Sequence, residues 1–474
     1  MAEASVAASV KRAPASAAEA ATARRMQLLL LCDVNWASER TIVDHARAIA
    51  TYSRHDVKVL PMRGDLPRGL EVARFDAVVI HYSLAVASEA CLSAAARASL
   101  RRYAGLKAAF VQDDYRWVNR TVAALAFIGV DLLFALAPED MLETIYPSAE
   151  LPGLRKITVL AGYAPEELTQ VSVPAYQDRP IDVGYRARKL PAWLGSHGQE
   201  KWRIGERFLA DAPGYGLRCD IAWREADRIY GDAWPRFVMS CKAMLGTESG
   251  AGVCDFTGEI QHAVERHELA APDTPFETLR ELYFKDDDGK VPTKVISPRC
   301  FEAAALRTLM ILYEGRYSGI LEPWRHYVPL RRDHSNMAEV VAVLRDPGRA
   351  GEIIERAYRE IALNPAYSFR AMVAAMDRAL EAAATESTRP ATLPSYSIQS
   401  FNAAVRTHRR RQAFRQGMAG LTRRGYGVVF GKLLKLLPDT VNDGLRLGAK
   451  RAWVRVRGRN RLAAEPRGRV ARDQ

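Results

Sequence analysis

The feature that most constrains the fold is an alternation, repeated twice along the chain, of short apolar runs with stretches of helical length. Short apolar runs bounded by polar residues indicate strands that are buried on both faces, as in parallel sheets. Strands that alternate with helices in this way predict a doubly wound parallel sheet. One series fills residues 26–165 and a second begins at Ile181. We therefore expect an α/β fold with two Rossmann-like domains that face a cleft.

The expected elements follow from these patterns. Strands are expected at Gln27–Cys32, Asp56–Leu60, Phe75–His81, Lys107–Val111, Asp131–Leu136, Lys156–Ala161, Ile181–Tyr185, Arg218–Ala222, Lys242–Leu245 and Thr308–Leu312. Helices are expected at Ser38–Tyr52, Ser88–Tyr103, Trp117–Phe127, Pro138–Ile145, Gln199–Leu209, Trp234–Met239, Met337–Leu344, Ala350–Leu363 and Ser368–Ala384, the last three finishing the second domain. No GxGxxG follows the first strand, so ordinary Rossmann binding of NAD or FAD is not expected.

Composition divides the chain further. The expected parts are a disordered Ala/Ser-rich leader at 1–25, a first domain at 26–165, a linker at 166–180, a second domain at 181–365, a closing helix at 366–388 and a basic amphipathic tail at 389–474. The six cysteines are scattered, with no CxxC pair and no nearby histidine cluster. This spacing favours a reducing cytoplasm and predicts neither a disulfide framework nor a metal site.

The net charge of +13 belongs to the tail. Residues 401–474 hold 19 Lys and Arg against 4 Asp and Glu, whereas the first 400 residues hold 49 against 51. Within the tail, Tyr426–Leu437 (YGVVFGKLLKLL) is a short apolar stretch with two lysines, and Trp453 lies among further cations. Such a segment is typical of an interfacial element on an anionic membrane surface, with a solvated basic tail as the alternative. No nucleic-acid module is recognised, so nucleic acid is not an expected partner.

The stretch Val291–Asn336 carries the strongest local signal for a ligand. Ser297 and Pro298 predict a helix start, with serine at the N-cap and proline in the first turn. The exposed N–H groups and the dipole of a helix N-terminus attract phosphate, and Arg299 adds a cation there. Glu302 lies one turn further on, roughly on the same face, where its carboxylate can accept hydrogen bonds from ribose hydroxyls. An ordinary helix with a surface arginine and glutamate is the competing interpretation.

The first domain offers candidates at the carboxyl ends of its strands, which form the functional edge of such a sheet. Asp113 and Asp114 follow one predicted strand, and His81 ends another. An inward carboxylate or imidazole at this edge can orient or deprotonate an acceptor hydroxyl. A structural cap or loop contact is the alternative for each of the three residues.

Several segments together resemble a known family. They are VGYRAR, LGTESGAGVCDFTG, SPRCFEAAA, YEGRYSGILEP and HYVPLRRDHSN. In their order and spacing the chain resembles bacterial glycosyltransferases of the GT-B fold, of the group 1 or family 4-like kind, in the branch related to spore-maturation proteins and surface-polysaccharide clusters. The resemblance is strongest over residues 181–345. It implies a UDP- or GDP-linked sugar donor in the second domain, an acceptor facing the first, and retaining transfer without metal or other cofactor.

The resemblance also implies roles for individual residues. Glu302 matches the glutamate that binds the nucleotide ribose, but Lys294 stands where the family carries another glutamate, which contacts the donor sugar. The stretch GTESGAGVCD, with Glu248, Ser249 and Asp255, is the candidate source of the missing acidic contact. Arg186 matches an arginine that binds the diphosphate. Lys189 and Lys201 are both candidates for the lysine that follows it.

The function expected from these patterns is transfer of a sugar from the nucleotide donor to a surface-polysaccharide or lipid-linked acceptor. The protein would be cytoplasmic and peripheral on the inner membrane, held there by its tail. Two other functions remain open. A nucleotide-sugar epimerase shares the same architecture, and a non-catalytic adaptor would account for Lys294 in place of the expected glutamate.

Overall fold

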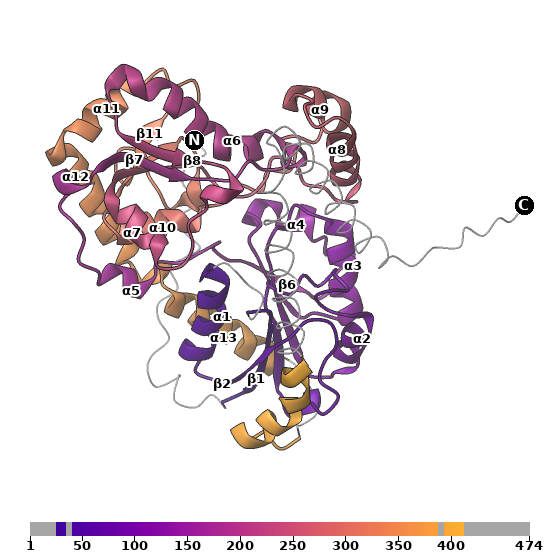
Figure 1. Cartoon of the computed structure of the whole chain (residues 1–474). Coiled ribbons are helices and arrows are strands. Elements are labelled where there is room, and N and C mark those ends of the chain that lie inside the picture. Colours follow the sequence, from indigo (N-terminus) through magenta and orange to yellow (C-terminus); the bar gives the residue numbers. More distant parts are fainter. Residues whose placement is uncertain (1–24, 35–39, 387–392, 412–474) are drawn as a thin grey trace, which may run out of the picture.

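The computed structural model describes residues 25–34, 40–386 and 393–411, which form two parallel sheets (Figure 1). The first sheet has the strand order β2-β1-β3-β4-β5-β6. Its strands are β1 (Gln27–Cys32), β2 (Asp56–Pro61), β3 (Ala77–Ile80), β4 (Leu106–Val111), β5 (Leu132–Ala135) and β6 (Arg155–Thr158). The second sheet has the order β11-β10-β9-β7-β8. Its strands are β7 (Ile181–Arg186), β8 (Cys219–Ala222), β9 (Cys241–Gly246), β10 (Leu309–Tyr313) and β11 (Val328–Leu330).

Helices cover both faces of each sheet. They are α1 (Arg40–Tyr52), α2 (Ala94–Arg102), α3 (Val118–Ile128), α4 (Leu142–Ile145), α5 (Glu166–Thr169), α6 (Gly195–Asp211), α7 (Ala233–Ser240), α8 (Glu259–Ala270), α9 (Phe276–Tyr283), α10 (Pro298–Ala305), α11 (Met337–Arg345), α12 (Pro347–Ala357) and α13 (Phe369–Thr385), and a further helix runs over 398–411. Among these residues, no helix is both long and apolar enough to span a bilayer. The predicted α/β class with two doubly wound domains is confirmed.

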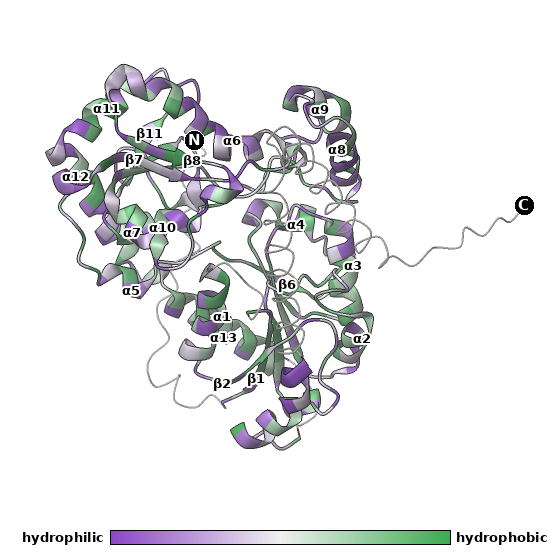
Figure 2. Cartoon of the chain, in the orientation of Figure 1, coloured by the Kyte–Doolittle hydropathy of each residue, from purple (hydrophilic) through white to green (hydrophobic). Residues whose placement is uncertain are grey.

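The apolar runs form strands as predicted because the central strands are buried from both sides. In β1, Leu29 and Leu31 point to the face covered by α2 and α3, whereas Leu28 and Leu30 point to the face covered by α1 and α13. All four side chains are fully buried. Figure 2 shows the central strands in green and the surrounding helices in mixed green and purple. Burial of successive residues on opposite faces explains why these strands lack a polar alternation.

The sequence prediction missed β11, α5, α8, α9 and the helix over 398–411, and it misplaced the start of α2. β11 is a strand of three residues, too short to give a pattern. Helices α8 and α9 fold within the polar excursion after β9, which carries little apolar periodicity. The helix expected from Ser88 begins instead at α2, because the side chain of Ser93 caps it by accepting a hydrogen bond from the backbone N–H of Ala96 at 3.1 Å.

The last long helix, α13, belongs to the first domain rather than to the second. Met372, Val373, Met376 and Leu380 are buried against the first sheet beside α1. Asp377 adds polar contacts there, since its carboxylate accepts hydrogen bonds of 2.9 Å from the Ser53 hydroxyl and the Arg54 backbone. The expectation that Ser368–Ala384 finishes the second domain was wrong, and the chain crosses back to cover the sheet where it began.

The start of the expected tail is also part of the first domain. Tyr396, Phe401 and Val405 are buried in the core that contains Phe75. The Tyr396 hydroxyl accepts a hydrogen bond of 3.0 Å from the backbone N–H of Glu71. The boundary at 389 was therefore placed too early for a tail that is separate from the fold. The leader (apart from Arg25) and the apolar and Trp453 segments of the tail lie outside the described residues.

Candidate functional site

A pocket of about 610 Å³ opens between the two domains. It lies at the carboxyl ends of β7 and β9, adjacent strands whose connections leave toward opposite sides of the sheet. This is the topological switch point at which open α/β sheets bind ligands. The second domain supplies most of the wall, and the first supplies Thr41 and Asp44 of α1 and Gln112 and Asp113 after β4.

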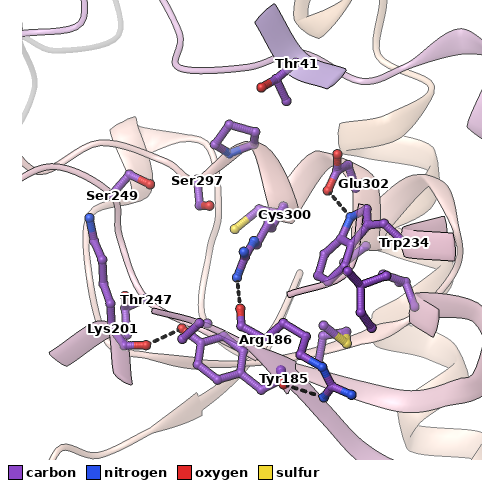
Figure 3. Close-up of a pocket in the computed structure, with 18 of the residues that line it drawn as sticks. Thr41, Tyr185, Arg186, Lys201, Trp234, Thr247, Ser249, Ser297, Cys300 and Glu302 are labelled. Atoms are coloured by element: carbon purple, nitrogen blue, oxygen red, sulfur yellow. Dashed lines mark hydrogen bonds between the residues drawn. The ribbon is translucent and has the colours of Figure 1, made fainter. Parts of the chain in front are cut away.

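The N-terminus of α10 points into this pocket, as the sequence predicted. Ser297 stands at the N-cap with φ −80° and ψ 140°, and Pro298 occupies the first turn. The Ser297 hydroxyl makes no capping hydrogen bond, and both residues line the pocket (Figure 3). The helix start therefore leaves a serine hydroxyl and the positive end of a dipole directed at the cavity.

Arg299 and Glu302, one turn apart on α10, both line the pocket and both contact Trp234 of α7. The Trp234 indole donates a hydrogen bond of 2.8 Å to the Glu302 carboxylate. The Arg299 guanidinium lies over the Trp234 ring, 5.0 Å from its centroid, and donates a hydrogen bond to the carbonyl of Arg186. The pair that the sequence placed on one helix face is thus gathered around one aromatic ring.

Arg186 lines the pocket at the end of β7, but its guanidinium is already engaged. It forms an ion pair of 2.8 Å with Asp220 and donates to the carbonyls of Tyr185 and Asp220. The group also stacks on Phe237 at 4.3 Å from the ring centroid. Among the predicted donor cations, Arg186 is therefore held toward β8, whereas Arg299 lies at the helix start.

Lys201, on α6, is the third predicted cation that lines the pocket. Its ammonium donates a hydrogen bond of 2.8 Å to the carbonyl of Gly250. Burial lowers the pKa of Lys201 to about 8, although the negative charge of Asp113 across the cleft acts in the opposite direction. Lys189, the other candidate, lies outside the pocket wall, with its ammonium 5.3 Å from the Trp202 ring centroid.

Glu248 and Ser249 follow β9 and line the pocket, but Lys294 does not. The Glu248 carboxylate is buried and accepts a hydrogen bond of 2.9 Å from the backbone N–H of Tyr317. Lys294 is half-buried next to Val295, which pairs with Ser249 in an isolated antiparallel bridge. Of the two acidic residues proposed to replace the missing glutamate, only Glu248 is thus placed for that role.

Asp255 is fully buried away from the pocket and supports the contact between the domains. Its carboxylate accepts hydrogen bonds from the backbone N–H groups of Gly258, at 2.7 Å, and Gln261, at 2.8 Å. Residues 115–119 of the first domain contact residues 255–258, and we call this contact the clasp. Arg116 extends it with a hydrogen bond of 2.8 Å to Gln261. Asp255, predicted to contact the donor, therefore lies outside the pocket wall, and its carboxylate caps the start of α8.

The three catalytic candidates of the first domain occupy different environments. His81 is fully buried and hydrogen-bonds His45 at 3.0 Å, and burial together with His45 holds its pKa well below the usual value. Asp114 is buried as well, where its carboxylate accepts from the Leu136 backbone and the Tyr146 hydroxyl, and burial raises its pKa to about 7. Neither lines the pocket, and only Asp113 does. The structure therefore places the side chains of His81 and Asp114, both predicted as catalytic, in the first-domain core and not at the pocket wall.

Sequence reasoning missed Trp234 and Thr41 as pocket residues. Trp234 was predicted only as the first residue of a helix, and α7 indeed spans Ala233–Ser240. Its aromatic side chain at a helix start after the loop Arg228–Gly231 was the available signal. No signal in the sequence indicated that Thr41 lines the pocket, because a threonine early in a helix is common.

Comparisons with known proteins find only distant structural similarity. No protein-family model matches this chain, and no curated protein sequence does. It is similar to the structure of alpha-glucosyltransferase with UDP and a 13-mer DNA containing an HMU base, with 8% identity, a TM-score of 0.48, and 76% of this chain and 100% of that chain covered. It is also similar to HepE from Anabaena with UDP-glucose, with 11% identity, a TM-score of 0.43, and coverage of 77% and 100%. At these values the likeness carries no argument about activity.

Proposed function

We propose that this chain is a glycosyltransferase that binds a UDP- or GDP-linked sugar in the pocket between its domains. One observation carries the proposal: the start of α10, Arg299 and Glu302 converge on the same wall of a pocket at the switch point of the second sheet. A helix N-terminus and a guanidinium suit a diphosphate, and a carboxylate one turn away suits ribose hydroxyls.

The same groups suit the chemistry of sugar transfer. The bond between the sugar C1 and the diphosphate oxygen breaks, and C1 forms a bond to an acceptor oxygen whose proton leaves. Negative charge grows on the departing diphosphate, so fixed cations and backbone N–H groups lower the barrier. Arg299, Lys201 and the α10 N-terminus supply that charge in our proposal, without a metal. Retaining stereochemistry is the part of the proposal that rests on the sequence resemblance.

The acceptor side of the site faces the first domain. Asp113 contributes a carboxylate to the pocket from the carboxyl end of β4. We propose that it contacts the hydroxyl of a glycan or lipid-linked acceptor. The basic residues of 412–474 would hold the enzyme on the anionic surface of the inner membrane, where such acceptors are assembled.

Calorimetric titration with UDP and GDP tests the donor site. Arg299→Ala and Glu302→Ala are each expected to weaken binding of the preferred nucleotide about tenfold or more, because each removes a charge-assisted contact. Arg356→Ala and Glu339→Ala, on α12 and α11 away from the pocket, are the matched controls and should change nothing. If Arg299→Ala and Glu302→Ala both bind as the unmodified protein does, the donor site is wrong.

Two outcomes would point to the other functions. Turnover of UDP-N-acetylglucosamine in the absence of any acceptor would identify an epimerase. A protein that binds no sugar nucleotide would favour an adaptor that keeps the fold and docks through its tail.

A further inference from the structure

We propose that Trp234 is a positioning residue of the donor site, which holds Glu302 for the ribose and Arg299 for the diphosphate at the same time. The inference rests on the proposed function and adds to it a residue that no sequence motif indicated. It also defines the ligand class more closely, as a nucleoside diphosphate with both ribose hydroxyls free.

The two contacts of Trp234 use different parts of its side chain. The indole N–H donates a hydrogen bond of 2.8 Å to the Glu302 carboxylate (Figure 3). The ring face carries the Arg299 guanidinium at 5.0 Å. Both partners come from α10, three positions apart, whereas Trp234 comes from α7. Residues at i and i+3 lie side by side on a helix, so one ring can reach both.

Further contacts hold the Trp234 ring itself in place. Phe237, one turn further along α7, is buried and packs against Trp234 with ring centroids 5.9 Å apart. Arg186 lies over Phe237, and the carbonyl of Arg186 accepts the hydrogen bond of Arg299. The four side chains are therefore linked by successive contacts, from Arg299 through the two aromatic rings to Arg186.

A support of this kind matters because glutamate and arginine side chains rotate freely unless something fixes them. Each rotamer-rich side chain that becomes ordered only upon binding weakens the affinity, and an ordered one does not. A hydrogen bond to a carboxylate fixes where its oxygens stand, and a cation–π contact fixes a guanidinium. Trp234 thus gives the pocket its ribose acceptor and its diphosphate donor in a prepared geometry.

The test measures the affinity of the unmodified protein, Trp234→Phe and Glu302→Gln for UDP and for 2′,3′-dideoxy-UDP. If the protein prefers GDP, then GDP and 2′,3′-dideoxy-GDP replace the uridine pair. The unmodified protein should prefer the ribonucleotide, and both variants should lose most of that preference. Trp234→Phe keeps an aromatic face for Arg299 but removes the N–H donor, so UDP binding should weaken about tenfold while dideoxy-UDP binding changes little. A purely structural role for Trp234 would weaken both ligands equally and leave their ratio unchanged.

Trp202→Phe is a closely matched control. The Trp202 indole also donates to a side-chain oxygen, that of Gln199 at 3.0 Å, and also carries a cation, Lys189 at 5.3 Å, but Trp202 does not line the pocket. This variant should keep both the affinity and the ratio. The double variant Trp234→Phe, Glu302→Gln should show no smaller preference for UDP over 2′,3′-dideoxy-UDP than Glu302→Gln alone, because the two residues act as one unit.

The outcomes of this test distinguish the role of Trp234 from the proposed function on which it rests. If the ratio collapses in Glu302→Gln but not in Trp234→Phe, the donor site stands and the role of Trp234 is overturned. If the unmodified protein binds no nucleoside diphosphate, both the proposed function and this inference are overturned.

Discussion

The backbone N–H of Asp255, in the second domain, donates a hydrogen bond of 2.7 Å to the carbonyl of Tyr115, in the first. The hydroxyl of Tyr115 in turn donates 2.7 Å to the carboxylate of Asp113, which lines the pocket. The clasp between the domains and the first-domain wall of the pocket are therefore one continuous structure. What fixes the domains against each other also fixes the position of the Asp113 carboxylate.

The clasp predicts that Gly258 does not tolerate a side chain. Gly258 has φ +88°, and an added Cβ would lie 2.4 Å from the indole of Trp117. Gly258→Ala should lower the free energy of unfolding by about 2–4 kcal/mol, as the sum of left-handed strain and overpacking. Urea denaturation measures this loss. Gly289→Ala, at φ +93° with open space around it, should cost only the strain of about 1–2 kcal/mol, and equal losses would contradict the close contact.

The pKa of Lys201 predicts that nucleotide binding depends on pH. Because that pKa is about 8, the ammonium is largely charged at pH 7 and largely neutral at pH 9. If the charged form holds the diphosphate, UDP affinity should fall about tenfold over this interval. Calorimetry at each pH measures the fall, and Lys201→Gln should bind weakly at both. A steep fall that survives in Lys201→Gln would assign the titration to another group.

Burial of Lys201 also has a consequence for stability. Its pKa in the folded protein, about 8, lies below the unfolded value of 10.5, so the unfolded chain binds more protons between these values. The contribution of Lys201 to stability therefore rises with pH through this window. Thermal unfolding of the unliganded protein from pH 7.5 to 10 should show this rise relative to Lys201→Met. Parallel pH profiles for the two proteins would contradict the lowered pKa.

The fold was largely predictable because each strand of the two sheets except β11 overlaps a short apolar run of the sequence. The sequence did not show against which sheet each helix packs. α13 carries the same amphipathic pattern whether it covers the second sheet or the first, and only the packing of Met376 and Leu380 decides between them. The sequence prediction missed the helix over 398–411 because its composition is basic and just two residues, Phe401 and Val405, anchor it in the core.

The candidate site was predictable where a role depends on backbone position and unpredictable where it depends on side-chain direction. Ser297, Arg299 and Glu302 follow from the start of one helix, and the structure places all three in the pocket. Asp113 and Asp114 are neighbours at the end of one strand, yet one faces the pocket and the other the core. Both residues lie beyond the end of β4, where Asp113 has a positive φ of 62°, so strand alternation does not predict which of the two side chains faces the cleft.

Asp113 is expected to act on the acceptor and not on the donor. Asp113→Asn should lower the rate of sugar transfer about tenfold or more while leaving UDP affinity within twofold, because the contact is made with the acceptor hydroxyl. Initial rates together with calorimetry measure both quantities. Asp114→Asn is the neighbouring control, which should lower thermal stability through its buried hydrogen bonds without a selective loss of transfer. An unchanged rate in Asp113→Asn would remove Asp113 from the site.

Residues 412–474 are expected to bind membranes without serving the fold. A protein that ends at Arg411 should keep its unfolding temperature and its UDP affinity, and should sediment less with phosphatidylglycerol-containing vesicles than the full chain does. A protein that ends at residue 392 should lose stability too, because it lacks Tyr396, Phe401 and Val405 of the core. Equal sedimentation of the full chain and the shorter form ending at Arg411 would reject the membrane role.

The central claim is that α10 and the residues around it bind a nucleoside diphosphate sugar. A crystal structure of the protein with its preferred nucleotide sugar tests this most directly. We expect diphosphate oxygens at the N-terminus of α10 within about 3 Å of Arg299 nitrogens, and ribose hydroxyls on the Glu302 carboxylate. A nucleotide bound elsewhere in the cleft, with Arg299 and Glu302 still turned only to Trp234, would contradict the donor site described above.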